Sequence, residues 1–187
     1  MCSTPSSGCS TKGSGNRERN LDQRLISKFP VPGGRAVDVS RAGLLNCGVS
    51  DILFRSDASG DTGFYAISNG VNAGWSDVGG SSTAYNILGT GDFYGTGTTD
   101  ILYRSNASGD TGFYQISNGA NIGWHDIGAS STAYAVVGVG DFMGNGTDDI
   151  LYRNSTTGDT GFYAISNGVN TGWHGLGASS TAYHVVS

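Results

Sequence analysis

Tryptophan followed by serine or histidine recurs three times in this sequence, at intervals of 49 residues, and in the first two copies an aspartate comes next. The indole face can stack on an apolar surface, such as one face of a sugar ring. A nearby aspartate accepts hydrogen bonds and a histidine can donate one, so the combination suits a ligand rich in hydroxyl groups. The candidate ligand-binding residues are Trp75, Asp77, Trp124, His125, Asp126, Trp173 and His174.

The same aromatic residues have a structural alternative. Tryptophans and tyrosines at equivalent positions of a repeat also pack between sheets, where they bury a large area. The binding motif is weakened in its third occurrence, because Gly175 stands where Asp126 stands in the second. Both interpretations stay open from the sequence.

The sequence contains no recognisable catalytic motif. Its histidines, His125, His174 and His184, have no nucleophile or acid at a characteristic spacing. A phosphate-binding glycine loop, zinc-ligand spacing and the G-x-S-x-G motif are also lacking. We therefore expect that the protein is not an enzyme.

A long internal repeat contains all of the candidate residues. Units of this length in tandem are supersecondary structures that bury their apolar faces on one another. The repeats span residues 51–99, 100–148 and 149–187.

Each repeat predicts four short strands. In the second repeat, Ile101–Arg104 is a short apolar run and Gly112–Ser117 alternates between apolar and small or polar residues. Asn118-Gly119 favours a tight hairpin, with Gly123–Ile127 as the returning strand. The most apolar stretch, Tyr134–Phe142, completes the unit. Four strands in such a repeat predict an all-β fold built of propeller-type blades of four antiparallel strands.

The stretch GDF-x-G-x-G-x-x-D-I-L-x-R, from Gly140 to Arg153, resembles FG-GAP/VCBS repeats, and the resemblance covers residues 48–187. It implies the β-propeller blades of secreted bacterial proteins and of integrin α heads. An extracellular or cell-surface location is therefore expected, although no signal-peptide pattern is visible.

The resemblance also implies calcium binding in the loop that follows GDF. Calcium prefers six to eight oxygen ligands, and two middle positions of the loops are lost to Tyr94 and Met143. We therefore expect weak binding in the second loop and weaker binding in the first. The retained ligands are Asp141, Asn145 and Asp149 in the second loop, and Asp92 and Asp100 in the first.

A structural alternative for these loops involves the only cations of the repeats. Asp92 and Asp141 would cap turns and form ion pairs with the repeat arginines. This hypothesis predicts an Asp–Arg contact in each repeat, with a structural role for Arg55, Arg104 and Arg153.

Charge divides the chain at the start of the repeats. Residues 1–50 contain seven Lys or Arg and three acidic residues, whereas residues 51–187 contain three Arg and twelve Asp. An acidic repeat surface repels phosphate, so we expect no nucleic-acid partner. No apolar run approaches the roughly 18 residues of a membrane span. We interpret residues 1–47 as a basic, low-complexity and disordered segment outside the repeats.

Three repeats are fewer than the four to eight blades of a closed propeller. Open edges recruit another chain, so we expect a partial propeller that self-associates, most simply as a six-bladed dimer, or a part of a longer propeller. The function that we expect is non-enzymatic recognition or adhesion outside the cell, with a glycan or a protein bound in the blade clefts. The alternative is a purely structural repeat of a larger secreted protein.

Overall fold

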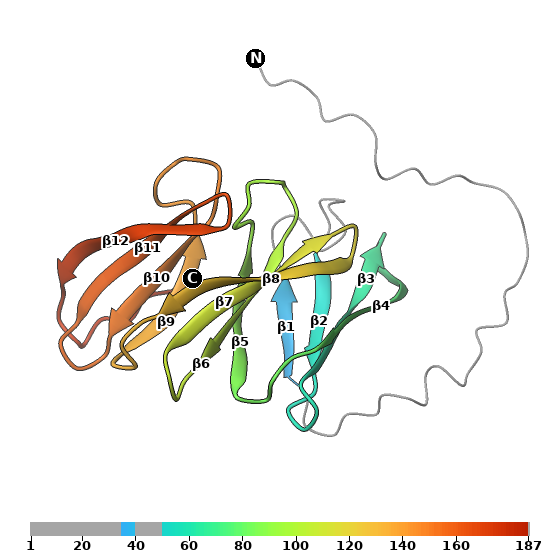
Figure 1. The fold of residues 1–187 in the computed structure, drawn as a ribbon, viewed down its shortest axis with the longest axis horizontal. Coiled ribbons are helices and arrows are strands. Elements are labelled where there is room, and N and C mark those ends of the chain that lie inside the picture. Colours follow the sequence, from blue (N-terminus) through green and yellow to red (C-terminus); the bar gives the residue numbers. More distant parts are fainter. Residues whose placement is uncertain (1–34, 40–49, 187) are drawn as a thin grey trace, which may run out of the picture.

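The computed structural model describes the backbone of residues 35–39 and all of residues 50–186, as three antiparallel sheets side by side (Figure 1). The described residues contain strands and turns but no helix, which confirms the predicted all-β class. The strands are β1 (Arg35–Val39), β2 (Asp51–Arg55), β3 (Asp61–Ser68), β4 (Val71–Gly80), β5 (Tyr85–Gly91), β6 (Asp100–Ser105), β7 (Asp110–Ser117), β8 (Ala120–Ala129), β9 (Tyr134–Gly140), β10 (Asp149–Asn154), β11 (Asp159–Ser166) and β12 (Val169–Ala178).

Each sheet is a meander of four consecutive strands, as predicted for a propeller-type blade. We call them blade 1 (β1–β4), blade 2 (β5–β8) and blade 3 (β9–β12). A tight hairpin turn joins the last two strands of each meander. In blade 2 this turn lies between β7 and β8, and its Asn118 and Gly119 have φ values of 50° and 78°. A tight turn that needs two positive φ angles favours this pair of residues. Asn69-Gly70 and Asn167-Gly168 form the same turn in the other blades.

The sequence repeats and the blades are out of phase. Strand β5 lies at the end of the first repeat but pairs with β6, and β9 pairs with β10 in the same way. Strand β1 lies within residues 1–47 and pairs with β2, so part of this segment belongs to blade 1. The expected disorder of residues 1–34 and 40–47 concerns residues that lie outside the described part of the chain.

The blades pack face to face around two apolar cores. In the first core, Leu53 and Phe64 of blade 1 meet Ile101 and Tyr103 of blade 2, and all four are fully buried. Burial of each such side chain contributes roughly 1.5–3 kcal/mol. These interfaces therefore hold neighbouring blades together. Within the described residues, no helix is long and apolar enough to cross a membrane.

The repeat arginines fasten each blade to the segment that follows it. Arg104 donates to the carbonyl oxygens of Gly109, Ser131 and Tyr134 and to the hydroxyl of Ser130. Its guanidinium also lies 5.5 Å from the ring centroid of Tyr152 in blade 3.

Arg55 repeats this arrangement with Gly60, Ser82, Tyr85 and the ring of Tyr103. The predicted Asp–Arg contact is therefore wrong for these arginines, whose charge is balanced by backbone carbonyls and an aromatic face.

Candidate functional site

The three candidate tryptophans occupy equivalent places on the last strand of each blade, at Trp75 in β4, Trp124 in β8 and Trp173 in β12. Trp124 lies over Gly112 of the neighbouring strand, where a methyl group would come within 2.2 Å of Cζ2 of the indole. Only glycine leaves room for the ring. Trp124 nevertheless remains 40% exposed, so part of its ring can meet a ligand.

Tyrosines from the other three strands of blade 2 surround Trp124. Its ring centroid lies 5.3 Å from that of Tyr114, 5.7 Å from that of Tyr85 and 6.1 Å from that of Tyr103. The contacts are edge-on or tilted, as aromatic pairs prefer. Together with Ser81 and Ser82, these rings line a cleft of about 130 Å³. We call it the aromatic cleft.

A hydroxyl–carboxylate pair accompanies the aromatic cleft. The Tyr85 hydroxyl donates to the carboxylate of Asp110, and this hydrogen bond raises the pKa of Tyr85. The charge of Asp126 contributes in the same direction, so a candidate predicted from the sequence lies close to this pair. Tyr134 and Asp159 form the same pair in blade 3. The sequence analysis did not select Tyr85 or Asp110, although both residue types recur in register.

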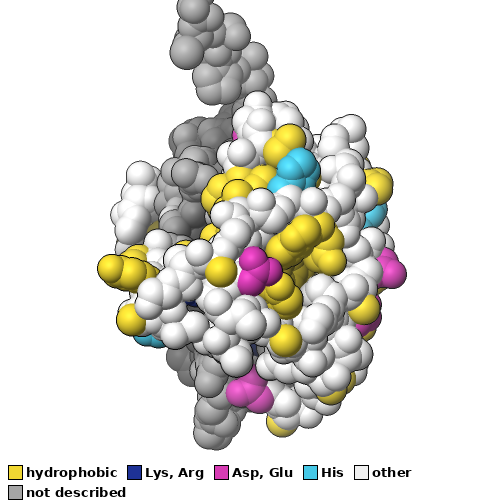
Figure 2. Space-filling view, turned by 90° about the vertical axis from the view of Figure 1, so that its left-hand side faces the viewer, with side chains coloured by type: hydrophobic (Ala, Val, Ile, Leu, Met, Phe, Trp, Pro, Cys, Tyr) yellow, Lys and Arg dark blue, Asp and Glu magenta, His cyan; other side chains and the backbone are white. Residues whose placement is uncertain are grey.

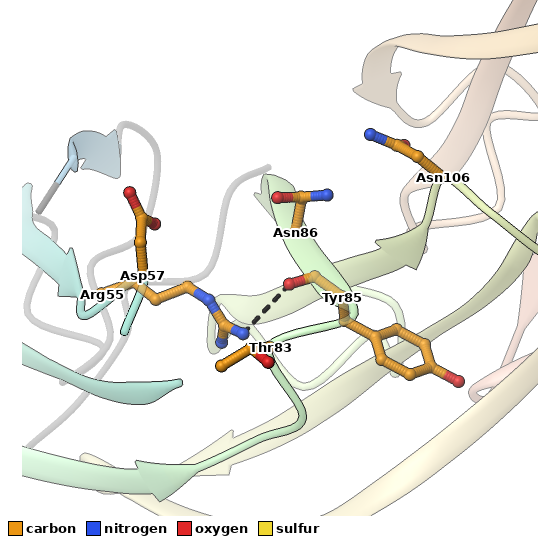
Figure 3. Close-up of a pocket in the computed structure, with 6 residues that line it drawn as sticks. All are labelled: Arg55, Asp57, Thr83, Tyr85, Asn86 and Asn106. Carbon is orange, nitrogen blue, oxygen red and sulfur yellow. Dashed lines mark hydrogen bonds between the residues drawn. The ribbon is translucent and has the colours of Figure 1, made fainter. Parts of the chain in front are cut away.

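A second, more polar pocket of about 390 Å³ lies beside the junction of blades 1 and 2 (Figure 3). Tyr85 lines both pockets, and Figure 3 shows its ring pointing away from Asn86, its neighbour on β5. Asp57 and Asn106 come from the β2–β3 and β6–β7 turns. The remaining lining residues are Arg55 and Thr83.

The polar residues of this pocket are not repeated at the next junction. At the junction of blades 2 and 3, the residues equivalent to Asp57, Asn86 and Asn106 are Asn106, Ala135 and Ser155. The carboxylate and one amide are thus lost there. A difference of this kind between otherwise similar repeats was the signal in the sequence that could have indicated the pocket.

The structure separates the predicted tryptophan–histidine pairs. His125 stacks on Phe113 at 5.0 Å and contacts Tyr94, on the opposite face of β8 from the Trp124–Tyr114 contact. His174 stacks on Phe162 in the same way. Adjacent residues of a strand point to opposite faces. Trp124 and His125 therefore cannot bind one ligand together, and the same holds for Trp173 and His174.

Asp77 and Asp126 each have a local partner. Their side chains accept hydrogen bonds from the backbone N–H groups of Gly79 and Gly128. Each uses one oxygen in this turn, so the other remains available as an acceptor.

No protein-family model matches this chain, and searches of the curated proteins and of the solved structures returned no significant match. The resemblance to FG-GAP/VCBS repeats and the extracellular location therefore stay predictions.

The candidate calcium ligands act as acceptors for backbone N–H groups. Asp149 is fully buried and accepts from Ile165, Phe142 and Met143. Asp100 is equally buried and accepts from Ile116 and Phe93.

In the exposed part of the loops, Asp92 accepts from Thr96 and Gly97, and Asp141 accepts from Asn145 and Gly146. These contacts confirm the turn-capping role of the two residues. The amide oxygen of Asn145 is used by Thr147. Among the described residues, no group of three His, Cys, Asp or Glu is placed to hold a metal ion. Calcium binding in these loops stays a prediction.

Burial raises the pKa of Asp100 to about 7, against the effect of its two backbone hydrogen bonds. Because the folded-state pKa lies above the unfolded value, the folded protein binds this proton more tightly than the unfolded chain. The contribution of Asp100 to stability is therefore largest in acid and is lost as the pH rises from about 4 through 7. We expect the free energy of unfolding to fall by roughly 1.4 kcal/mol per pH unit from this group alone.

Chemical denaturation at pH 5 and pH 8 measures the effect, and Asp100→Asn should flatten the difference. An equally steep pH dependence in Asp100→Asn would assign it to other groups.

Proposed function

We propose that this chain is a non-enzymatic recognition module that binds glycans at the junction of blades 1 and 2. The observation that carries the proposal is the half-exposed ring of Trp124, seated on Gly112 and set beside the Tyr85–Asp110 pair. An aromatic face next to fixed hydrogen-bonding groups suits a ligand with both apolar faces and hydroxyl groups.

The polar pocket adds further hydrogen-bonding groups to the proposed binding site. Its carboxylate, amides and hydroxyl can bind several hydroxyl groups of a neutral ligand, whereas the Arg55 guanidinium is already committed to backbone carbonyls. At about 390 Å³, the pocket falls in the range of roughly 300–1,000 Å³ that is usual for small-molecule sites. Because Tyr85 lines both pockets, one oligosaccharide could contact both.

A specific observation favours the structural alternative. All three tryptophans sit on glycines and contact neighbouring tyrosines, so packing alone gives them a role. The polar pocket distinguishes the two functions, because four of its lining residues, Asp57, Thr83, Asn86 and Asn106, are exposed and have no evident packing role.

Intrinsic fluorescence tests the proposal, since the chain contains only three tryptophans and they occupy equivalent positions on the last strand of each blade. A glycan array selects the probe, and titration of that oligosaccharide should quench or shift the emission. We expect Trp124→Phe and Asn86→Ala to weaken binding about 10-fold or more. Alanine occurs naturally at the equivalent Ala135, so Asn86→Ala should preserve the fold.

Trp173→Phe serves as the matched control, because Gly175 and Ala135 leave the junction of blades 2 and 3 without the corresponding polar groups. It should leave the affinity unchanged. If no glycan binds, or if Trp124→Phe and Trp173→Phe weaken binding equally, the proposed site is wrong.

A further inference from the structure

Each blade has two different apolar faces. The trailing face, which packs against the next blade, consists of Leu53, Phe64 and Val78 in blade 1 and of Leu102, Phe113 and Ile127 in blade 2. The leading face, which packs against the previous blade, consists of Ile101, Tyr103 and Ile116 in blade 2 and of Ile150, Tyr152 and Ile165 in blade 3. The same pair of faces thus meets twice within the molecule.

Part of the trailing face of blade 3 is exposed in the described structure, although Phe162 at its centre is only 5% exposed. Phe142 is 47% exposed and Leu176 is 62% exposed, whereas the equivalent Phe93 and Ile127 of blade 2 are 0% and 6% exposed. Figure 2 views the molecule from this end and shows hydrophobic side chains gathered across the centre of the face. A contiguous apolar patch of this kind marks an interaction surface.

The leading face of blade 1 is also partly exposed. Ile52 is 39% exposed, whereas the equivalent Ile101 and Ile150 are fully buried. Phe54 and Ile67, which are equivalent to Tyr103 and Ile116 of blade 2, are only half-buried. The two ends of the molecule therefore expose the two halves of an interface that is formed elsewhere in the same chain.

We infer that the trailing face of blade 3 in one copy of this chain packs against the leading face of blade 1 in a second copy. Because the two faces differ, the contact is head-to-tail, and such contacts form either a closed ring or an open filament. Two copies with three blades each give six blades, within the four to eight of known propellers. This association requires no ligand and is independent of the proposed function.

One asparagine hydrogen bond crosses each internal interface between blades, and the proposed contact between two copies has the same donor and acceptor. Asn121 of blade 2 donates to the carbonyl oxygen of Val78, and Asn170 of blade 3 donates to that of Ile127. In the proposed pairing, Asn72 of one copy takes the corresponding place beside the Leu176 carbonyl of the other. The chain thus supplies the polar as well as the apolar part of the interface.

Light scattering on the full chain tests the pairing. We expect a mass of twice the 19.2 kDa of one chain. Ile52→Asp and Leu176→Asp should each raise the dissociation constant about 100-fold or more, because a charge would be buried without a partner. Both positions are exposed in the single chain, so neither substitution should unfold it.

Mixing the two variants distinguishes head-to-tail pairing from any symmetric contact. Each variant keeps one intact face, so the mixture should form a 1:1 complex although each variant alone is monomeric. Ile122→Asp, on the middle blade, is the control for adding a charge at an exposed apolar side chain and should leave the mass unchanged.

A monomeric wild-type chain would overturn the inference, as would a dimer that persists in Ile52→Asp. A ladder of larger masses that either variant abolishes would support head-to-tail pairing but overturn closure with two copies.

Discussion

Replacing Arg104 by methionine is expected to lower the free energy of unfolding by about 3 kcal/mol, within the range for losing one partner of a buried charged network. Methionine keeps much of the side-chain volume but removes donors to three carbonyl oxygens and one hydroxyl. It also removes the cation–π contact with Tyr152. Denaturation monitored by circular dichroism measures the loss.

The chain provides a matched control at Arg153. This residue donates to Gly158 and Thr160 within blade 3 and to Ser179 and Ser180 in the segment that follows it. Its described contacts include neither a tyrosine ring nor a strand carbonyl of a following blade. Arg153→Met should therefore cost about 1–2 kcal/mol less than Arg104→Met. Equal losses would show that the contacts between blades contribute nothing.

Replacing Asp149 by alanine is expected to cost about 3–5 kcal/mol, because three backbone N–H groups lose their acceptor in a fully buried site. These groups join strand β11 to the loop before β10. The change should therefore loosen blade 3 first. Hydrogen exchange at Ile165, Phe142 and Met143 locates the effect.

Asp141→Ala is the control for this prediction, because Asp141 accepts two backbone hydrogen bonds in an exposed turn, where water can replace it. Its effect on stability should be much smaller. Repeating both measurements with calcium and with a chelator also tests the calcium prediction. Stabilisation of the wild type by calcium that is lost in Asp141→Ala would place an ion in this loop, whereas equal stability in both conditions would exclude a contribution.

The local features of the fold were accessible from the sequence. Four strands per repeat follow from short apolar runs separated by turn residues, and the Asn-Gly hairpins follow from the positive φ angles that such turns need. The position of β1 was not predicted, because Arg35–Val39 lacks the repeat pattern and becomes a strand only by pairing with β2.

The candidate site was predicted in part. Trp124 and Asp126 lie near the aromatic cleft, but His125 does not, because adjacent residues of a strand point to opposite faces. The prediction grouped the three residues by their distance along the chain and did not take this alternation into account. The polar pocket combines residues of two strands, two turns and the segment between β4 and β5, so no short stretch of sequence contains it.

By itself, the sequence determined the repeat, the all-β class and the number of blades, because these depend on patterns within about 49 residues. Only the tertiary structure decided which side chains share a surface. Arg104 binds carbonyl oxygens instead of an aspartate, and Asp100 and Asp149 bind backbone N–H groups in the core. Every residue type except proline carries the same backbone donor and acceptor, so contacts between a charged side chain and the backbone have no sequence motif that would predict them.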